Sequence, residues 1–319
     1  MLREGGLVAF PTETVYGLGA NALDARAVSR IYEAKQRALN DPLIVHIAAP
    51  EQLEQVADLS ALSDLQRARL DALAGAFWPG PLTVVVWRKA SVPANVSAGL
   101  DTLAVRFPSH PIAQALIRYA QCPIAAPSAN RFGHVSPTTA QHVLDDLDGR
   151  IDLVLDGGAT PIGLESTVVN LTTEPPQLLR PGGVTRAQVE AVLGVALAAP
   201  VQQNDESAMP APGMLTRHYA PRARLVLCAD EDALLAQHAF LKGQGELVGA
   251  LLMRDHARAQ ATIHPHFVLG QTLEEVARNL YAGLRALDAQ GVSVILAVRL
   301  PEVGVGEAIA DRLRRASAR

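Results

Sequence analysis

A short apolar run near the amino terminus, residues 7–10, stops at Pro11 and is followed by a polar turn that contains glycine. A run of this length and composition is typical of a short buried strand. Thr12, Glu13 and Thr14 come directly after it, and two closely spaced glycines follow. Open α/β sheets hold their ligands where strands end in such turns, although a turn without any ligand has the same local pattern. The rest of the chain must decide between a binding loop and a plain turn.

Predicted strands and helices alternate in the first half of the chain, and strands crowd together later. Apolar runs predict the strands, and apolar residues at helical spacing predict the helices. The strands are predicted at residues 7–10, 43–48, 82–87, 103–107, 123–126, 153–156, 166–171 and 177–180, and the helices at 24–35, 63–77, 110–120 and 139–147. This order predicts an α/β fold with a twisted open sheet of mixed strand direction.

A change of pattern near residue 197 divides the 319-residue chain. The stretch that follows is rich in Ala, Pro, Gln, Asn and Ser and lacks periodicity, which is typical of a linker. Strands are then predicted at residues 225–228, 247–252 and 292–298, and helices at 231–241, 273–289 and 307–316. The sequence thus predicts a first domain at 1–197, a linker at 198–221 and a small open βαβ domain at 222–319.

Composition and charge exclude several classes of protein. Hydrophobic residues make up 49% of the chain and charged residues 19%, so sizeable cores can form. The net charge of −4 argues against a protein that holds nucleic acid mainly by bulk electrostatics. Cys122 and Cys228 form no disulfide framework, and His264 and His266 lack zinc-site spacing and are predicted to lie in a surface loop. With no signal-peptide pattern and no apolar run near the roughly 18 residues of a membrane helix, we expect a soluble cytoplasmic protein without membrane contact.

Charged and polar side chains stand in or beside buried strands at several places in the first domain. They are Lys35 and Arg37 before a strand, His46 and Arg106 within strands, and Arg180 at the end of one. A buried arginine is costly without a partner, so Arg106 must meet an anion, either a protein carboxylate or a ligand. Each feature alone has a structural explanation, such as an internal ion pair or a core histidine. Together they favour an anion-binding pocket.

Polar loops at strand ends add neutral hydrogen-bond donors to this pocket. Ser128, Asn130 and Ser136 are of the kind that phosphate sites use, although the first two could equally form a local turn network. No GxxxxGK[ST] pattern is present, which excludes a Walker-type phosphate loop. No GxSxG pattern surrounds Ser128 or Ser166, so serine hydrolysis is not expected. The glycines at positions 304 and 306 lack the third glycine of a dinucleotide fingerprint.

These elements, in this order, resemble those of the threonylcarbamoyl-AMP synthases, and the resemblance covers nearly the whole chain. The matching stretches are residues 10–20, 35–37, 42–47, 77–83, 128–130, 136–138, 165–168 and 180–182, and those that match the longer members are 212–214, 217–221 and 304–313. The resemblance implies a YrdC-like mixed sheet followed by a smaller Rossmann-like domain.

The resemblance also implies the reaction. L-threonine, bicarbonate or CO2, and ATP give threonylcarbamoyl-adenylate and pyrophosphate, with magnesium on the phosphates. A separate threonylcarbamoyl transferase then modifies the adenosine beside the anticodon of certain tRNAs, so tRNA is a partner only indirectly or weakly. The residues that it implies for L-threonine are Thr14, His46, Arg106, Ser166 and the backbone at Ala126. Those that it implies for ATP are Lys35, Arg37, Asp41, Thr102, Ser128, Asn130, Ser136, Arg180 and Tyr219. No residue is implied as a covalent nucleophile and none as a certain metal ligand.

Three features depart from the family pattern. Ala38 replaces the proline that is frequent after Lys-x-Arg. Asp41 stands where a neutral or basic residue is common, and its carboxylate could repel phosphate or help to hold magnesium. The chain begins only a few residues before its first strand, so the usual N-terminal helix is expected to be shortened or absent.

Two other functions are compatible with parts of the pattern. The first is a non-catalytic module that binds tRNA or double-stranded RNA. The acidic net charge and the lack of a basic cluster with stacking aromatic residues argue against this function. A carbamoyl-adenylate enzyme of hydrogenase maturation would need zinc-finger cysteines, and the chain has two cysteines.

The end of the predicted linker is richer in ligand-type side chains than a spacer requires. Arg217, His218 and Tyr219 follow one another there. We expect the linker to cover the pocket of the first domain as a lid, with Tyr219 on the nucleotide. A lid would exclude water from an acyl-adenylate that hydrolyses readily.

Overall fold

The computed structural model describes residues 1–200, 207–216 and 218–318. The chain divides into two compact units. The first comprises Met1–Phe132, Pro137–Pro161 and Glu165–Leu215, and the second comprises Gly133–Ser136, Ile162–Leu164 and Thr216–Arg319. The predicted linker is therefore shared between the units, and its residues 201–206 and Arg217 lie outside the described residues.

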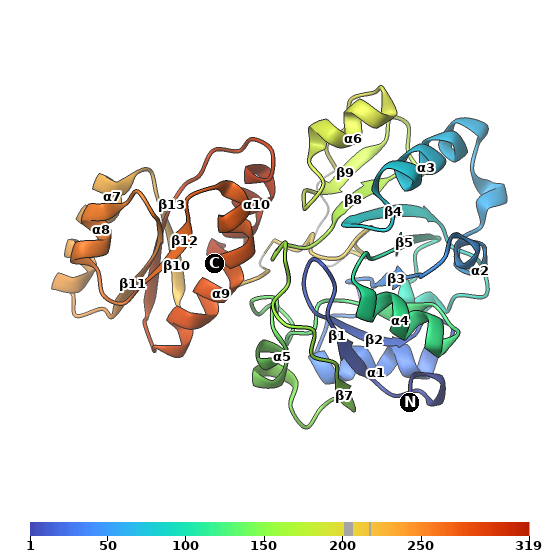
Figure 1. Ribbon diagram of the computed structural model, residues 1–319, viewed down its shortest axis with the longest axis horizontal. Coiled ribbons are helices and arrows are strands. Elements are labelled where there is room, and N and C mark those ends of the chain that lie inside the picture. Colours follow the sequence, from blue (N-terminus) through green and yellow to red (C-terminus); the bar gives the residue numbers. More distant parts are fainter. Residues whose placement is uncertain (201–206, 217, 319) are drawn as a thin grey trace. The chain divides into compact units, whose positions relative to one another are not determined.

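The first unit is built on a mixed sheet that has nine strands within the described residues (Figure 1). Its order is β7-β1-β2-β6-β3-β5-β4-β8-β9, with β8 and β9 at one edge and β1 and β7 at the other. The strands are β1 (Val8–Phe10), β2 (Gly17–Asn21), β3 (Ile44–His46), β4 (Leu82–Trp87), β5 (Thr102–Arg106), β6 (Ile124–Ala126), β7 (Leu153–Val154), β8 (Thr167–Asn170) and β9 (Gln177–Arg180). Parallel pairs such as β3–β5 alternate with antiparallel pairs such as β4–β5, which confirms the predicted mixed sheet.

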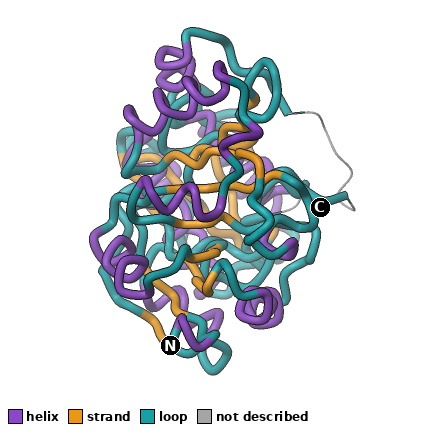
Figure 2. The backbone as a smooth tube through the Cα atoms, turned by 90° about the vertical axis from the view of Figure 1, so that its right-hand side faces the viewer, coloured by secondary structure: helices purple, strands orange, loops and turns teal. Residues whose placement is uncertain are grey.

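Helices cover this sheet and begin at side chains that cap them. The helices are α1 (Ala25–Lys35), α2 (Leu53–Val56), α3 (Asp64–Phe77), α4 (Pro111–Ala120), α5 (Ala140–Leu147) and α6 (Arg186–Leu193). Asp24 accepts hydrogen bonds from the backbone of Arg26 and Ala27, and Ser63 forms a capping box with Gln66. The strands are short and much of the chain is loop, coloured teal in Figure 2, so loops supply many of the polar groups near the sheet.

The two faces of the sheet differ in chemistry because neighbouring strand residues point to opposite sides. Val45 and Val105 pack into the large core against α1 and α3. Their neighbours Ile44 and Ala104 belong to a smaller cluster on the other face. His46 and Arg106 follow two residues later and therefore share that second face, which we call the site face. The alternation buries these two polar side chains away from the large core.

The second unit holds a sheet of four strands within the described residues, in the order β10-β13-β11-β12. All its pairs are parallel, which confirms the predicted Rossmann-like βαβ arrangement. The strands are β10 (Arg224–Cys228), β11 (Val248–Met253), β12 (His266–Gly270) and β13 (Val294–Val298), and the helices are α7 (Glu231–Gly243), α8 (Ala257–Thr262), α9 (Leu273–Ala289) and α10 (Gly306–Ser317).

The structure corrects three local interpretations. The glycines after the first strand lie in β2 and not in a turn, because a methyl group on Gly19 would meet the Ile124 side chain at 2.7 Å and Phe10 at 2.8 Å. Helix α6 was not predicted, although Thr185 and Gln188 form a capping box at its start. The prediction of a surface loop was wrong for His266, which begins β12 and pairs with Ala250 of β11.

Candidate active site

The loop after β1 is held by its own hydroxyl groups. Thr12 Oγ1 donates to the carbonyl oxygen of Val15 at 2.6 Å and lies 2.8 Å from Thr14 Oγ1. Because a hydroxyl has one proton, the Thr14 hydroxyl must donate to Thr12. This fixes the Thr14 oxygen as an acceptor for Arg106, whose Nη1 donates to it at 2.8 Å. The polar turn is therefore tied to Arg106 of β5, and its role in ligand binding stays a prediction.

Arg106 is buried at the end of β5 and forms an ion pair with Glu13, whose Oε1 lies 2.8 Å from Arg106 Nη2. The sequence left open whether this arginine meets a protein carboxylate or a ligand, and the structure shows the carboxylate. Burial raises the pKa of Glu13, but the guanidinium and nearby backbone N–H groups outweigh burial, so the pKa lies below its ordinary value. Glu13 was absent from the predicted site residues, and the demand of a buried arginine for an anion was the signal that could have found it.

His46 ends β3 beside Arg106, with which it is paired in the sheet. Its Nδ1 lies 3.1 Å from the carbonyl oxygen of Ile44, and since a carbonyl only accepts, Nδ1 carries the proton and Nε2 keeps its lone pair. The edge of Phe10 packs against the ring with centroids 6.0 Å apart. Burial, assisted by Arg106, lowers the pKa of His46 to about 3. His46 is thus a neutral acceptor beside a cation.

This buried histidine should make the protein less stable in acid. Between about pH 6.5 and 3 the unfolded chain binds a proton at His46 that the folded chain does not bind. The contribution of neutral His46 to the free energy of unfolding is therefore complete above pH 6.5 and is lost as the pH falls toward 3. Its full size is roughly 3–5 kcal/mol. We expect urea unfolding from pH 7.5 to 4.5 to show a smaller loss for His46→Gln than for the wild type. The same change at exposed His264 is the control, and parallel curves for wild type and His46→Gln would contradict the prediction.

Ser166 connects the threonine residues implied by the family with those implied for ATP. Its Oγ lies 2.7 Å from Thr83 Oγ1 and accepts a hydrogen bond from Arg180 Nη2 at 3.1 Å. Arg180 also donates through Nε and Nη2 to the Ser166 carbonyl. Gly182 lets the chain pass here, because a methyl group would lie 2.4 Å from backbone atoms of Glu165 and Thr167. Arg180 and Ser166 therefore form one rigid unit.

A second cluster of cations surrounds Asp41. Lys35 ends α1 and donates through Nζ to the carbonyl oxygens of Ser128, at 2.6 Å, and Asn130. Arg37 Nη2 lies 2.8 Å from Asp41 Oδ2. Burial raises the pKa of Asp41, while Arg37, Lys35 and Arg180 act to lower it. We call Lys35, Arg37 and Arg180 the cationic cluster.

The segment at residues 207–215 folds back onto the first unit. Arg180 Nη1 donates to the Pro212 carbonyl at 3.0 Å, and Met209 N donates to the Asn40 carbonyl at 2.9 Å. Ala211 is fully buried in the apolar cluster of the site face. We call residues 207–215 the return segment. The sequence analysis expected the linker to cover the pocket of the first domain, and the return segment contacts Arg180 of the cationic cluster. Its role as a lid stays a prediction.

The predicted residues of the first unit lie at two ends of neighbouring strands. Thr102 and the Asp41–Pro42 turn lie two to three residues before the paired residues Ile44 and Ala104, at the start of β3 and β5. Arg106 lies at the opposite end of β5, about 13 Å away at the rise of a strand. Ala126 pairs with Ile44 and therefore lies beside the start of β3. Ser128 forms a bridge with Gly17, the first residue of β2.

Two predicted ATP residues, Ser136 and Tyr219, belong to the second unit, so their contact with the nucleotide stays a prediction. Tyr219 is buried with φ of 60°, stacks on Tyr281 at 5.9 Å between ring centroids and lies 5.0 Å from the guanidinium of Arg312. Aromatic stacking and a cation over its face hold this side chain in place.

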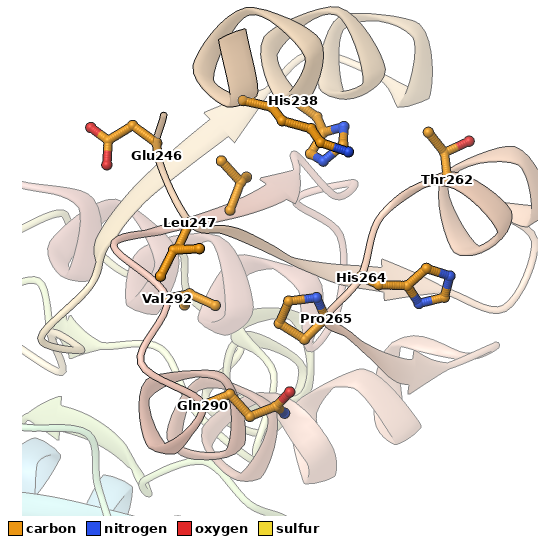
Figure 3. A pocket seen from close by; sticks show the side chains of 10 residues that line it. His238, Glu246, Leu247, Thr262, His264, Pro265, Gln290 and Val292 are labelled. Carbon is orange, nitrogen blue, oxygen red and sulfur yellow. The ribbon is translucent and has the colours of Figure 1, made fainter. Parts of the chain in front are cut away.

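The second unit also contains a cavity of about 260 Å³ (Figure 3). His238 and Lys242 line it from α7, and Leu247, His264 and Pro265 line it from the segments that lead into β11 and β12. It opens at the amino-terminal ends of parallel strands, whereas open α/β sheets bind ligands at the carboxyl ends. We assign it no chemistry.

Neither a protein-bound metal nor a membrane span is found in the part of the chain that the structure describes. No group of three His, Cys, Asp or Glu side chains there could hold a metal ion. None of the described helices is long and apolar enough to cross a membrane.

The fold and these clusters define an α/β protein with a mixed sheet and two buried groups of charged side chains in its first unit, one at Arg106 and Glu13 and one at Asp41. A family model described as "Telomere recombination" matches residues 1–182, and one described as "Threonylcarbamoyl-AMP synthase, C-terminal domain" matches residues 184–318. Threonylcarbamoyl-AMP synthases of Pyrococcus abyssi and Bacillus subtilis are 47% and 45% identical over 99% of this chain and 92% and 91% of their own lengths. The crystal structure of P. abyssi Sua5 complexed with L-threonine superposes with a TM-score of 0.91, at 46% identity over 99% of this chain and 92% of that one.

The chain belongs to the threonylcarbamoyl-AMP synthase family, in its two-domain form. The resemblance seen in the sequence is thereby confirmed.

Proposed function

We propose that the first unit makes threonylcarbamoyl-AMP from L-threonine, bicarbonate or CO2, and ATP, with release of pyrophosphate. The observation that carries this proposal is the presence of two buried groups with cationic side chains in the first unit, Arg106 beside His46 and the cationic cluster, joined through the Ser166–Arg180 contacts. Relatives named for this activity and the threonine complex of P. abyssi Sua5 support it.

The threonine subsite lies around Arg106. Its guanidinium faces the substrate carboxylate, as a planar fork suits a two-oxygen anion. Thr14 and Ser166 supply hydroxyl groups that Arg106 and Arg180 already orient. Neutral His46 offers Nε2 as an acceptor for the threonine hydroxyl or amine, a role that protonation would abolish.

The chemistry requires positioning more than a reactive side chain. The threonine amine attacks the carbon of CO2 and loses a proton, or attacks bicarbonate with loss of a water molecule; either route gives a carbamate. A carbamate oxygen then attacks the α-phosphorus of ATP, the bond to the bridging oxygen breaks, and pyrophosphate leaves with that oxygen. Two anions must be held together and in line, so the protein contributes mainly orientation and charge neutralisation.

The nucleotide subsite lies around the cationic cluster. Arg37 and Arg180 would face phosphate oxygens, and Lys35 would stabilise the Ser128–Asn130 loop beside them. Magnesium carried by the phosphates would neutralise part of their charge. The residues fit a metal that arrives with the nucleotide, since no group of three His, Cys, Asp or Glu side chains in the described part of the chain could hold a metal ion by itself.

The return segment and the second unit would serve as a lid and its anchor. The return segment already contacts Arg180 through Pro212, and its covering of the phosphate subsite would exclude water from the acyl-adenylate. We propose that Tyr219, held by Tyr281 and Arg312, completes the nucleotide contact. The product would then pass to a separate transferase that modifies tRNA.

Pyrophosphate release tests the proposal. We expect release from ATP only when L-threonine and bicarbonate are both present, together with an adenylate product detected by chromatography. L-Serine and a CO2-free buffer are the matched omissions. Equal turnover without threonine would refute the proposal, and a salt-dependent shift of RNA without ATP turnover would favour the RNA-binding module.

A further inference from the structure

The carboxylate of Asp41 is buried, and the groups that favour its charged form are three nearby cations and the backbone of Gly213. It has no exposed surface, and neither of its oxygens accepts a well-formed side-chain hydrogen bond in the described structure. Its ion pair with Arg37 spans 2.8 Å. A buried carboxylate in this condition is expensive, and burial raises the pKa of Asp41 above its ordinary value although Arg37, Lys35 and Arg180 act to lower it, so these cations offset only part of the cost of its removal from water.

Arg37 does not depend on that carboxylate for its position. Its Nε donates to the backbone carbonyl of Asp41 at 3.0 Å, and its Nη2 donates to the carbonyl of Pro42 at 2.8 Å. The ring of Phe132 lies 5.8 Å from the guanidinium carbon. These contacts do not involve the Asp41 side chain, so neutralising it leaves Arg37 oriented.

The other two cations are likewise positioned by neutral groups. Lys35 donates to the carbonyls of Ser128 and Asn130, and Arg180 to those of Ser166 and Pro212. Carbonyl oxygens orient a cation without cancelling its charge. All three cations act on Asp41, which therefore balances part of a charge that would otherwise face an incoming polyphosphate.

We propose that Asp41 is a resident counterion of the phosphate subsite, which stands in for a phosphate oxygen in the empty protein and weakens the hold on pyrophosphate. The inference rests on the proposed function, because it takes the cationic cluster to be the phosphate subsite. A phosphate that approaches Arg37 meets the carboxylate as a like charge, so the cluster binds the anion less tightly than three cations would. Weaker binding favours release of the pyrophosphate product.

The test is the affinity of full-length protein for inorganic pyrophosphate, measured by calorimetry in EDTA without threonine. We expect Asp41→Asn to lower the dissociation constant about tenfold or more, and pyrophosphate to raise the melting temperature of Asp41→Asn more than that of the wild type. Asp71→Asn is the matched control, because it removes the same charge from an exposed pair with Arg67 on α3.

Each outcome decides the matter. An unchanged or higher dissociation constant of pyrophosphate for Asp41→Asn would overturn the proposal. So would pyrophosphate binding by Asp41→Asn that is weaker than that of the wild type only when magnesium is added, because Asp41 would then be a metal ligand. Asp41→Ser is a second neutral variant. If both variants fold only with pyrophosphate present, the counterion role is supported, and if they fail to fold even then, the carboxylate is structural.

Failure of this inference is distinguishable from failure of the proposed function. Wild-type protein that releases pyrophosphate with threonine and bicarbonate, while Asp41→Asn binds pyrophosphate no more tightly, refutes the counterion alone. If Asp41→Asn binds pyrophosphate more tightly but the wild-type protein shows no threonine-dependent turnover, the anion site is supported and the synthase activity is refuted.

Discussion

Replacing Arg106 by alanine is expected to raise the L-threonine concentration for half-maximal turnover roughly 30-fold or more, with a much smaller change for ATP. Losing one partner of a buried, hydrogen-bonded charge pair costs roughly 2–5 kcal/mol, and each 1.4 kcal/mol is about tenfold in affinity. Arg106 donates to Thr14 and pairs with Glu13 at the end of β5, whereas the Arg37–Asp41 ion pair lies beside the start of the neighbouring strand β3. Steady-state pyrophosphate release at varied threonine and varied ATP measures the two effects separately.

Controls must separate binding from folding, because Arg106→Ala leaves Glu13 buried without its cation. The double variant Glu13→Gln/Arg106→Ala removes both charges and should fold more stably than Arg106→Ala while keeping the defect in threonine binding. Arg69→Ala removes an arginine that pairs with exposed Glu174 and should leave both substrates unaffected. Equal loss for threonine and ATP would show that Arg106 is structural.

Ending the chain at Leu197 is expected to weaken ATP binding about 5- to 100-fold and to reduce the yield of intact adenylate. Arg180 loses its Pro212 acceptor, which costs roughly 1–3 kcal/mol for a buried charged donor, and the site face loses the cover of Ala211. Water then reaches the acyl-adenylate more easily. Nucleotide titration and the ratio of adenylate to pyrophosphate measure the two losses.

A chain ending at Leu215 is the matched comparison. It keeps the return segment and lacks residues 216–319, which form most of the second unit and include Tyr219. We expect its ATP affinity to lie between those of the shorter and the full-length chain. If the chain ending at Leu197 binds ATP and retains adenylate as well as the full-length protein, the lid proposal is wrong.

The sequence alone determined the class of fold and most of its elements, because their signals are local. The run at Leu82–Trp87 and the capped helix Asp64–Phe77 carry their own periodicity and end signals, and both were predicted almost to the residue. The family pattern supplied the site residues in the same way, since short motifs persist at fixed spacing. The demand of a buried Arg106 for an anion also followed from sequence, as burial of an arginine within an apolar strand is a local inference.

Only the tertiary structure decided which group is the anionic partner of Arg106. Glu13 meets Arg106 across 93 residues of chain, and Pro212 of the predicted linker meets Arg180 across 32 residues. Strand β2 exists because Gly19 lets its backbone approach Ile124, a neighbour far away in the sequence. Pairings of this kind depend on strand order and on long-range burial, which no local pattern encodes. Asp41 shows both cases, since Arg37 and Lys35 stand only four and six residues before it, whereas Arg180 reaches it from 139 residues further along the chain.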